Sequence, residues 1–138
     1  MKRAPRIGMV ERAMIAHQWR RDAVDAGIHA LIGEDSDKMV HLSGRMFYVA
    51  LGAAVSEKMP IDDPDVRILR GAVNAVHDQV GQSEIPAVRR SSIVSGLQAV
   101  SRLVGRVSIK SITDSACELA IRMRYADVRL SDFEALMS

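Results

Sequence analysis

The residues that decide the fold are SDKMVHLSGRMFYVALGAAVS, numbered 36–56. Apolar side chains fill most of the helical wheel in this stretch: Met39, Leu42, Met46, Phe47, Val49, Ala50, Ala53 and Ala54. The remaining strip is polar or small and consists of His41, Arg45, Tyr48, Gly52 and Ser56. A helix that is apolar nearly all round is enclosed by other helices. We therefore predict that it forms the centre of a bundle, with Ser36 as its N-cap.

The rest of the chain carries further helical patterns and no strand-length alternation of polar and apolar residues. These patterns span residues 8–32, 62–81, 86–105 and 111–124, and a short tail follows at 131–137. Asp62-Asp63-Pro64 and Ser111-Ile112-Thr113-Asp114 provide start signals for two of the helices. The predicted fold is all-α: a compact bundle of about five helices with a short C-terminal helical tail.

The first of these helices, residues 8–32, has an interrupted apolar stripe and a glycine, Gly33, directly after its end. The stripe contains Val10, Met14, Val24, Ile28 and Leu31. His17 and the pair Arg20-Arg21 break it midway. Either two shorter helices meet at this point, or a single helix passes beyond its neighbours there.

Length and composition predict a single globular domain over residues 1–138, with residues 1–6 as a basic, flexible arm. The single cysteine, Cys117, excludes an internal disulfide and a site built from several thiolates. The basic start is followed by no apolar segment of a secretory leader, and the apolar run Met46–Val55 is too short to span a membrane. We expect a cytoplasmic protein.

The sequence offers little for catalysis. The phosphate-loop, dinucleotide-binding and hydrolase-elbow motifs are all absent from it. The four histidines, at positions 17, 29, 41 and 77, form no pair with the spacing that places two metal ligands on one helical face. Cys117 lies in a helical pattern and is best explained as a small buried hydrophobe. We predict no enzyme activity, no cofactor and no metal site.

A protein-contact site is predicted around the only tryptophan. Trp19 stands next to Arg20 and Arg21 where the first apolar stripe is broken. An aromatic anchor flanked by two charge-assisted hydrogen-bond donors is typical of an interface hot spot. The competing interpretation is a tryptophan at the edge of the core. The net charge also alternates along the chain: residues 31–85 are negative overall, and residues 1–30 and 86–130 are positive overall. This distribution is compatible with self-association.

DNA binding is the alternative hypothesis, because residues 93–123 have the helix, short turn and helix of a divergent helix-turn-helix. The side chains suited to phosphates are Arg89, Arg90, Arg102, Arg106 and Lys110, and those suited to base edges are Ser108, Lys110, Ser111 and Thr113. The segment departs from the pattern at Arg106, where a hydrophobic residue is expected. The competing interpretation is that these arginines lie on the solvated faces of two packed helices.

Of these hypotheses, the sequence favours a non-catalytic binding or regulatory protein that acts through protein–protein contacts, as a homo-oligomer or a small adaptor. Its contact residues are then Trp19, Arg20 and Arg21. A DNA-binding transcriptional regulator is second, and an enzyme is last.

Overall fold

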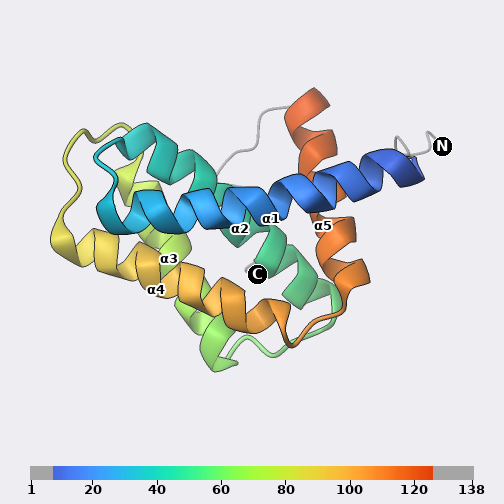
Figure 1. The fold of residues 1–138 in the computed structure, drawn as a ribbon. Helices are drawn as coiled ribbons and strands as arrows, with labels where there is room; N and C mark the ends of the chain where they lie inside the picture. The colour runs from blue at the N-terminus through green and yellow to red at the C-terminus, as the bar shows by residue number, and fades with distance from the viewer. Residues whose placement is uncertain (1–7, 126–138) are drawn as a thin grey trace.

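Over residues 8–125 the protein is a bundle of five helices, and the predicted all-α fold is confirmed (Figure 1). The structure is a computed structural model that describes residues 8–125, with side chains up to residue 122. The helices are α1 (Met9–Ile32), α2 (Ser36–Ser56), α3 (Pro64–Gln79), α4 (Ala87–Val104) and α5 (Ile109–Tyr125). The predicted basic arm at 1–6 and the predicted tail at 131–137 lie outside the described residues.

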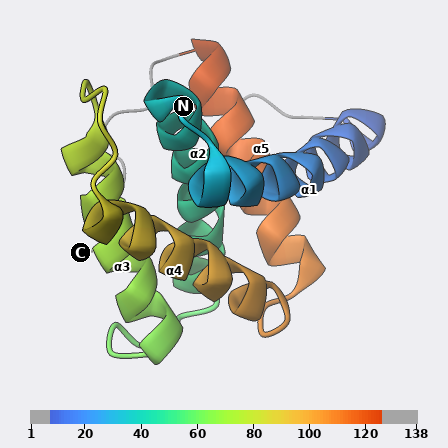
Figure 2. The same cartoon turned by 60° about the vertical axis from the view of Figure 1, so that its left-hand side comes forward.

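Helix α2 is the centre of the bundle, and this prediction is confirmed. All four other helices pack against α2, and Figure 2 shows it between α3 and α5. Its largest fully buried side chains are Met39, Met46, Phe47 and Leu51. Part of the expected polar strip is also covered, because Tyr48 is buried.

Two glycine contacts set how closely the helices approach one another. Gly52 of α2 faces the hydroxyl of Ser115 on α5, which donates a hydrogen bond of 2.8 Å to the carbonyl of Val49. Gly96 of α4 faces Ala72 and Phe47, and a methyl group added at Gly96 would lie only 2.8 Å from Cζ of Phe47. Both positions need a residue without a side chain because no space remains for one.

The helix starts differ from the sequence prediction at two places. Asp35, not Ser36, is the N-cap of α2, and its carboxylate accepts a hydrogen bond of 3.1 Å from the backbone N–H of Lys38. Helix α5 begins at Ile109, before the predicted Ser111, because the Ser108 hydroxyl accepts the backbone N–H of Ser111 at 3.1 Å. In both cases the polar residue nearer the N-terminus provides the cap.

The close contact at Gly96 leads to a paired prediction. Gly96→Ala should lower the free energy of unfolding by about 1–3 kcal/mol, since the core there is already full. Gly71→Ala is the control, because Gly71 is exposed on α3 with nothing within 4 Å of an added methyl group. It should raise stability by up to about 1 kcal/mol through helix propensity. Urea unfolding of both variants measures this, and equal effects would contradict the packing.

Candidate protein-contact surface

Helix α1 is a single continuous helix that lies across the bundle, over α2 and α5, and its N-terminal end projects beyond α5 (Figure 1). Its inner face consists of Trp19, Ala26 and Ala30, which are buried, with Ile15 and Ala23 partly buried beside them. Apart from Ile15 and Trp19, these side chains are small. The helix therefore approaches α2 closely while burying few large hydrophobic groups.

Polar contacts hold α1 in place near both of its ends. Near its start, Arg12 donates a hydrogen bond of 2.6 Å to the carboxylate of Asp114 on α5. At its end, Arg90 of α4 donates to the backbone carbonyls of His29, Ala30 and Gly33, with the shortest distance, 2.7 Å, to Gly33. The His29 carbonyl also accepts the backbone N–H of Gly33 at 3.0 Å. The last carbonyls of a helix lack the full set of helical donors, so the Arg90 guanidinium completes the C-terminus of α1.

The apolar stripe identified in the sequence points away from the bundle. We call it the outer stripe: Val10, Met14, Val24, Ile28 and Leu31, each between 50% and 76% exposed. At about 100° per residue, the outer stripe lies roughly 180° around the helix from the inner face. Helix α1 is therefore apolar on two opposite sides, and only one side is covered by the bundle.

The concentration of exposed apolar residues on this one helix is high. Among the described residues, fourteen large hydrophobic side chains are exposed, and seven of them belong to α1. The two outside the outer stripe are Met9 and Ile32, at the two ends of the helix. Grouped apolar surface marks interaction sites on proteins, whereas single exposed hydrophobic residues do not, and here Val10 and Met14 form one group and Val24, Ile28 and Leu31 another.

The predicted contact residues divide between the two faces of α1. Trp19 is only 7% exposed and belongs to the core, so its predicted role as a surface anchor was wrong. Trp19 lies on the same side of α1 as the buried Ala26 and Ala30, so the side that packs on the bundle also buries its ring. Arg20 and Arg21 are exposed at the middle of α1, and neither makes an ion pair with another described residue. Their contact with a partner stays a prediction.

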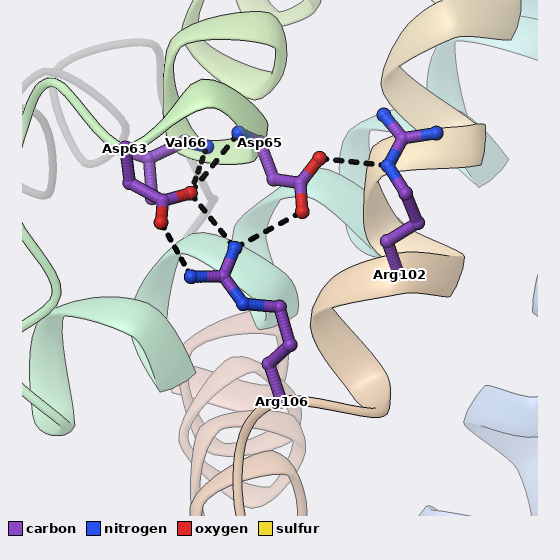
Figure 3. A network of polar contacts seen from close by, with 5 residues as sticks. All are labelled: Asp63, Asp65, Val66, Arg102 and Arg106. Atoms are coloured by element: carbon purple, nitrogen blue, oxygen red, sulfur yellow. Dashed lines mark hydrogen bonds and ion pairs between the residues drawn. The ribbon is translucent and has the colours of Figure 1, made fainter.

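Two arginines proposed for DNA instead form an ion-pair network at the start of α3 (Figure 3). Asp63 caps α3 by accepting the backbone N–H groups of Asp65 and Val66 at 3.0 and 3.3 Å. Arg106 donates to both oxygens of Asp63, at 3.0 and 2.5 Å, and to Asp65 at 3.1 Å. Arg102 of α4 donates to the other oxygen of Asp65 at 2.7 Å. The network fastens the start of α3 to the end of α4.

The electrostatics of this network follow from its geometry. Both carboxylates are buried, whereas both arginines are about half exposed. The bidentate Arg106 contact, aided by the two backbone N–H groups, lowers the pKa of Asp63 from its ordinary value of 3.8 to about 2. The same contact raises the pKa of Arg106. The carboxylate and the guanidinium therefore both stay charged across the physiological range.

The other DNA candidates also have partners inside the fold. Lys110 pairs with Asp114 at 2.8 Å, an exposed contact that, together with Arg12, lowers the pKa of Asp114. The hydroxyl of Thr113 donates to the carbonyl of Ile109 at 2.8 Å. The hydroxyls of Ser108 and Ser111 are hydrogen-bonded to each other at 3.0 Å.

Gln79 organises a second polar cluster, which the sequence did not indicate. Its buried side-chain amide donates to the hydroxyl of Ser36 and to the carbonyl of Glu84, both at 2.8 Å. Its carbonyl oxygen accepts the guanidinium of Arg89 at 2.9 Å. Arg89, which was predicted to contact DNA phosphates, thus makes a hydrogen bond within the fold. No local pattern pointed to Gln79, because its partners come from α2, from the loop after α3 and from α4.

The predicted helix, short turn and helix are present as α4, residues 105–108 and α5, but these two helices pack mainly on other helices. Helix α5 packs on α2 and α1, while α4 packs mainly on α3. The two helices joined by residues 105–108 are therefore not packed as the pair that presents a recognition helix to the major groove. DNA binding stays a prediction, and none of the contacts above favours it.

Groups with chemical reactivity are sparse in the described residues. No three His, Cys, Asp or Glu side chains there are grouped to hold a metal ion. Cys117 is buried on α5, and this burial raises the pKa of its thiol. None of the helices in residues 8–125 is long and apolar enough to cross a membrane.

Comparison with protein families, curated proteins and solved structures found no match.

The ion-pair network predicts a specific acid sensitivity. Because the pKa of Asp63 is lower in the folded chain, its charge stabilises the fold above pH 3.8, and this contribution is lost as the pH falls towards about 2. Asp63→Asn should therefore melt at a lower temperature than the natural chain at pH 6, and the difference should shrink between pH 4 and pH 2. Thermal unfolding followed by circular dichroism across this range measures the difference.

The control for this experiment is Asp62→Asn, since Asp62 is the exposed neighbour of Asp63 and has no hydrogen bond in the network. Its melting temperature should follow that of the natural chain at every pH. A difference between Asp63→Asn and the natural chain that stays constant from pH 6 to pH 2 would show that Asp63 is not held by Arg106.

Proposed function

We propose that this protein is a non-catalytic binding protein that acts through protein–protein contacts, and that the outer stripe of α1 is its contact surface. The single observation that carries the proposal is the apolar surface on the side of α1 opposite the core. Water contact with this surface is unfavourable, so covering it with another protein is favourable. Arg20 and Arg21 lie between the two apolar halves of this face and are exposed to solvent there.

The rest of the fold supports this proposal by holding α1 near both of its ends. The helix is fixed at one end by Arg12 and at the other by Arg90, so its outer face is already formed before any partner binds. A preorganised surface loses less conformational entropy on association than a mobile segment. The exposed stripe and the firm attachment together are typical of a surface that docks as a rigid unit.

A photo-cross-linking residue at Leu31 tests the proposal in living cells that express the full chain. Leu31 lies in the outer stripe and is exposed, so a bound partner should be captured as a covalent adduct of higher mass. Adding Ile28→Asp, one turn away, should remove the adduct, because an unpaired charge cannot be buried in an apolar contact. Mass spectrometry then identifies the captured protein.

The matched control places the cross-linking residue at Val88, which is 81% exposed at the start of α4. Its adducts, if any form, should be unchanged by Ile28→Asp. The proposal fails if Leu31 captures no protein, or if its adducts persist unchanged when Ile28 is replaced.

A further inference from the structure

We infer that the occupant of the outer stripe is a second copy of this chain, with the two α1 helices packed antiparallel about a twofold axis at the level of position 19. This inference rests on the proposed function and names its partner. Its basis is the order of residues along the outer face, the area that the face exposes and the position of its charges.

Six of the seven residues on the outer face, all except Leu31, form pairs at equal distances before and after position 19. Val10 and Ile28 lie nine residues before and after this position. Met14 and Val24 lie five residues before and after it. His17 and Arg21 lie two residues before and after it. In a twofold interface, residue i of one copy meets residue j of the other, and j meets i. The symmetric order thus places apolar side chains of one copy against apolar side chains of the other at both ends of the interface. It places polar side chains against polar side chains in the middle.

The spacing along the face is that of a helix–helix seam. Val10, Met14, His17, Arg21, Val24, Ile28 and Leu31 alternate steps of four and three residues. This repeat of 3.5 residues keeps one face of a helix against a neighbouring helix. In the antiparallel arrangement, Arg21 lies across from the second copy's His17. A parallel arrangement would place Arg21 directly against the second copy's Arg21, so the antiparallel pair is favoured.

The exposed area is sufficient for a pair of modest affinity. Fully burying one such side chain removes on the order of 100 Å² of apolar surface from water. At the exposures of the outer stripe, two copies together would bury about 600 Å² of apolar surface. With the polar share that interfaces contain, this amounts to about 1,000 Å² in total, the lower limit for a specific interface. We therefore expect association at roughly micromolar concentration.

The charges near the axis oppose association, and they predict how association depends on salt concentration. Arg20 and Arg21 of both copies lie within one turn of position 19, and none has an acidic partner on its own chain among the described residues. Their repulsion is screened by salt, with a Debye length of about 30 Å at 0.01 M and about 10 Å at 0.1 M. Association of the two copies should therefore strengthen as salt is added.

Sedimentation equilibrium of the full chain, from about 1 to 500 μM, tests the inference around its expected dissociation constant. The natural chain should pass from monomer to dimer within this range, and more readily at higher salt. Ile28→Asp places a charge at two symmetric sites and should raise the dissociation constant at least about 100-fold. The control, Val88→Asp, should dimerise like the natural chain.

A chain that stays monomeric throughout, or a dimer that Ile28→Asp does not weaken, would overturn the inference. If the chain is a monomer but its Leu31 cross-linker still captures another protein in an Ile28-dependent manner, the inference that the partner is a second copy is overturned. The proposed function would then still stand. If the chain neither dimerises nor captures a protein through Leu31, both the inference and the proposed function are overturned.

Single cysteines and a short bismaleimide test the antiparallel arrangement. Gln18→Cys lies next to the axis, so its two copies should be linked. Leu31→Cys lies twelve residues from the axis, which places its two copies about 36 Å apart, beyond the reagent. The natural chain is the control, because Cys117 is buried. Equal linking at positions 18 and 31 would show a parallel pair and contradict the proposal.

Discussion

The burial of most of α2, which all four other helices contact, is the constraint on which the rest of the structure depends. A helix with Met46, Phe47 and Leu51 fully buried requires neighbours around its circumference, and α1, α3, α4 and α5 supply them. Each neighbour needs only one apolar face for this purpose. All four outer helices contact another outer helix through an arginine, but α1 also carries a second apolar face that no described helix covers. The candidate contact surface is therefore the apolar face of α1 that is not used to bury α2.

The basic residues show how the same residue type serves different purposes according to its surroundings. Arg90, Arg102 and Arg106 turn inward to carbonyls and carboxylates, where charge-assisted hydrogen bonds hold helix ends together. Arg20 and Arg21 remain on the surface. Much of the basic charge near the C-terminal half is thus neutralised within the fold. What distinguishes the middle of α1 is that its charge lies between two apolar patches rather than beside a buried acid.

The sequence predicted the all-α fold and the central helix because their signals are local: the filled wheel of residues 36–56 and the Asp63-Pro64 helix start. The orientation of α1 could not be predicted in this way. Its large residues form one periodic stripe, while Trp19, Ala26 and Ala30 form another on the opposite side, and only packing shows which is buried. The roles of Arg106 and Gln79 were also missed, because Asp63 and Ser36 lie 43 residues away from them in the chain.

Solvent accessibility of the α1 methyl groups tests the central claim, that the outer stripe is apolar surface open to a partner. Methyl NMR with a soluble paramagnetic agent reports this for Ile28 and Leu31, with the buried Leu69 as internal reference. We expect strong broadening of the Ile28 and Leu31 signals at low protein concentration and protection at high concentration, while Leu69 stays protected throughout. Protection of Ile28 and Leu31 at every dilution would mean that the chain itself covers the stripe, and would contradict the account.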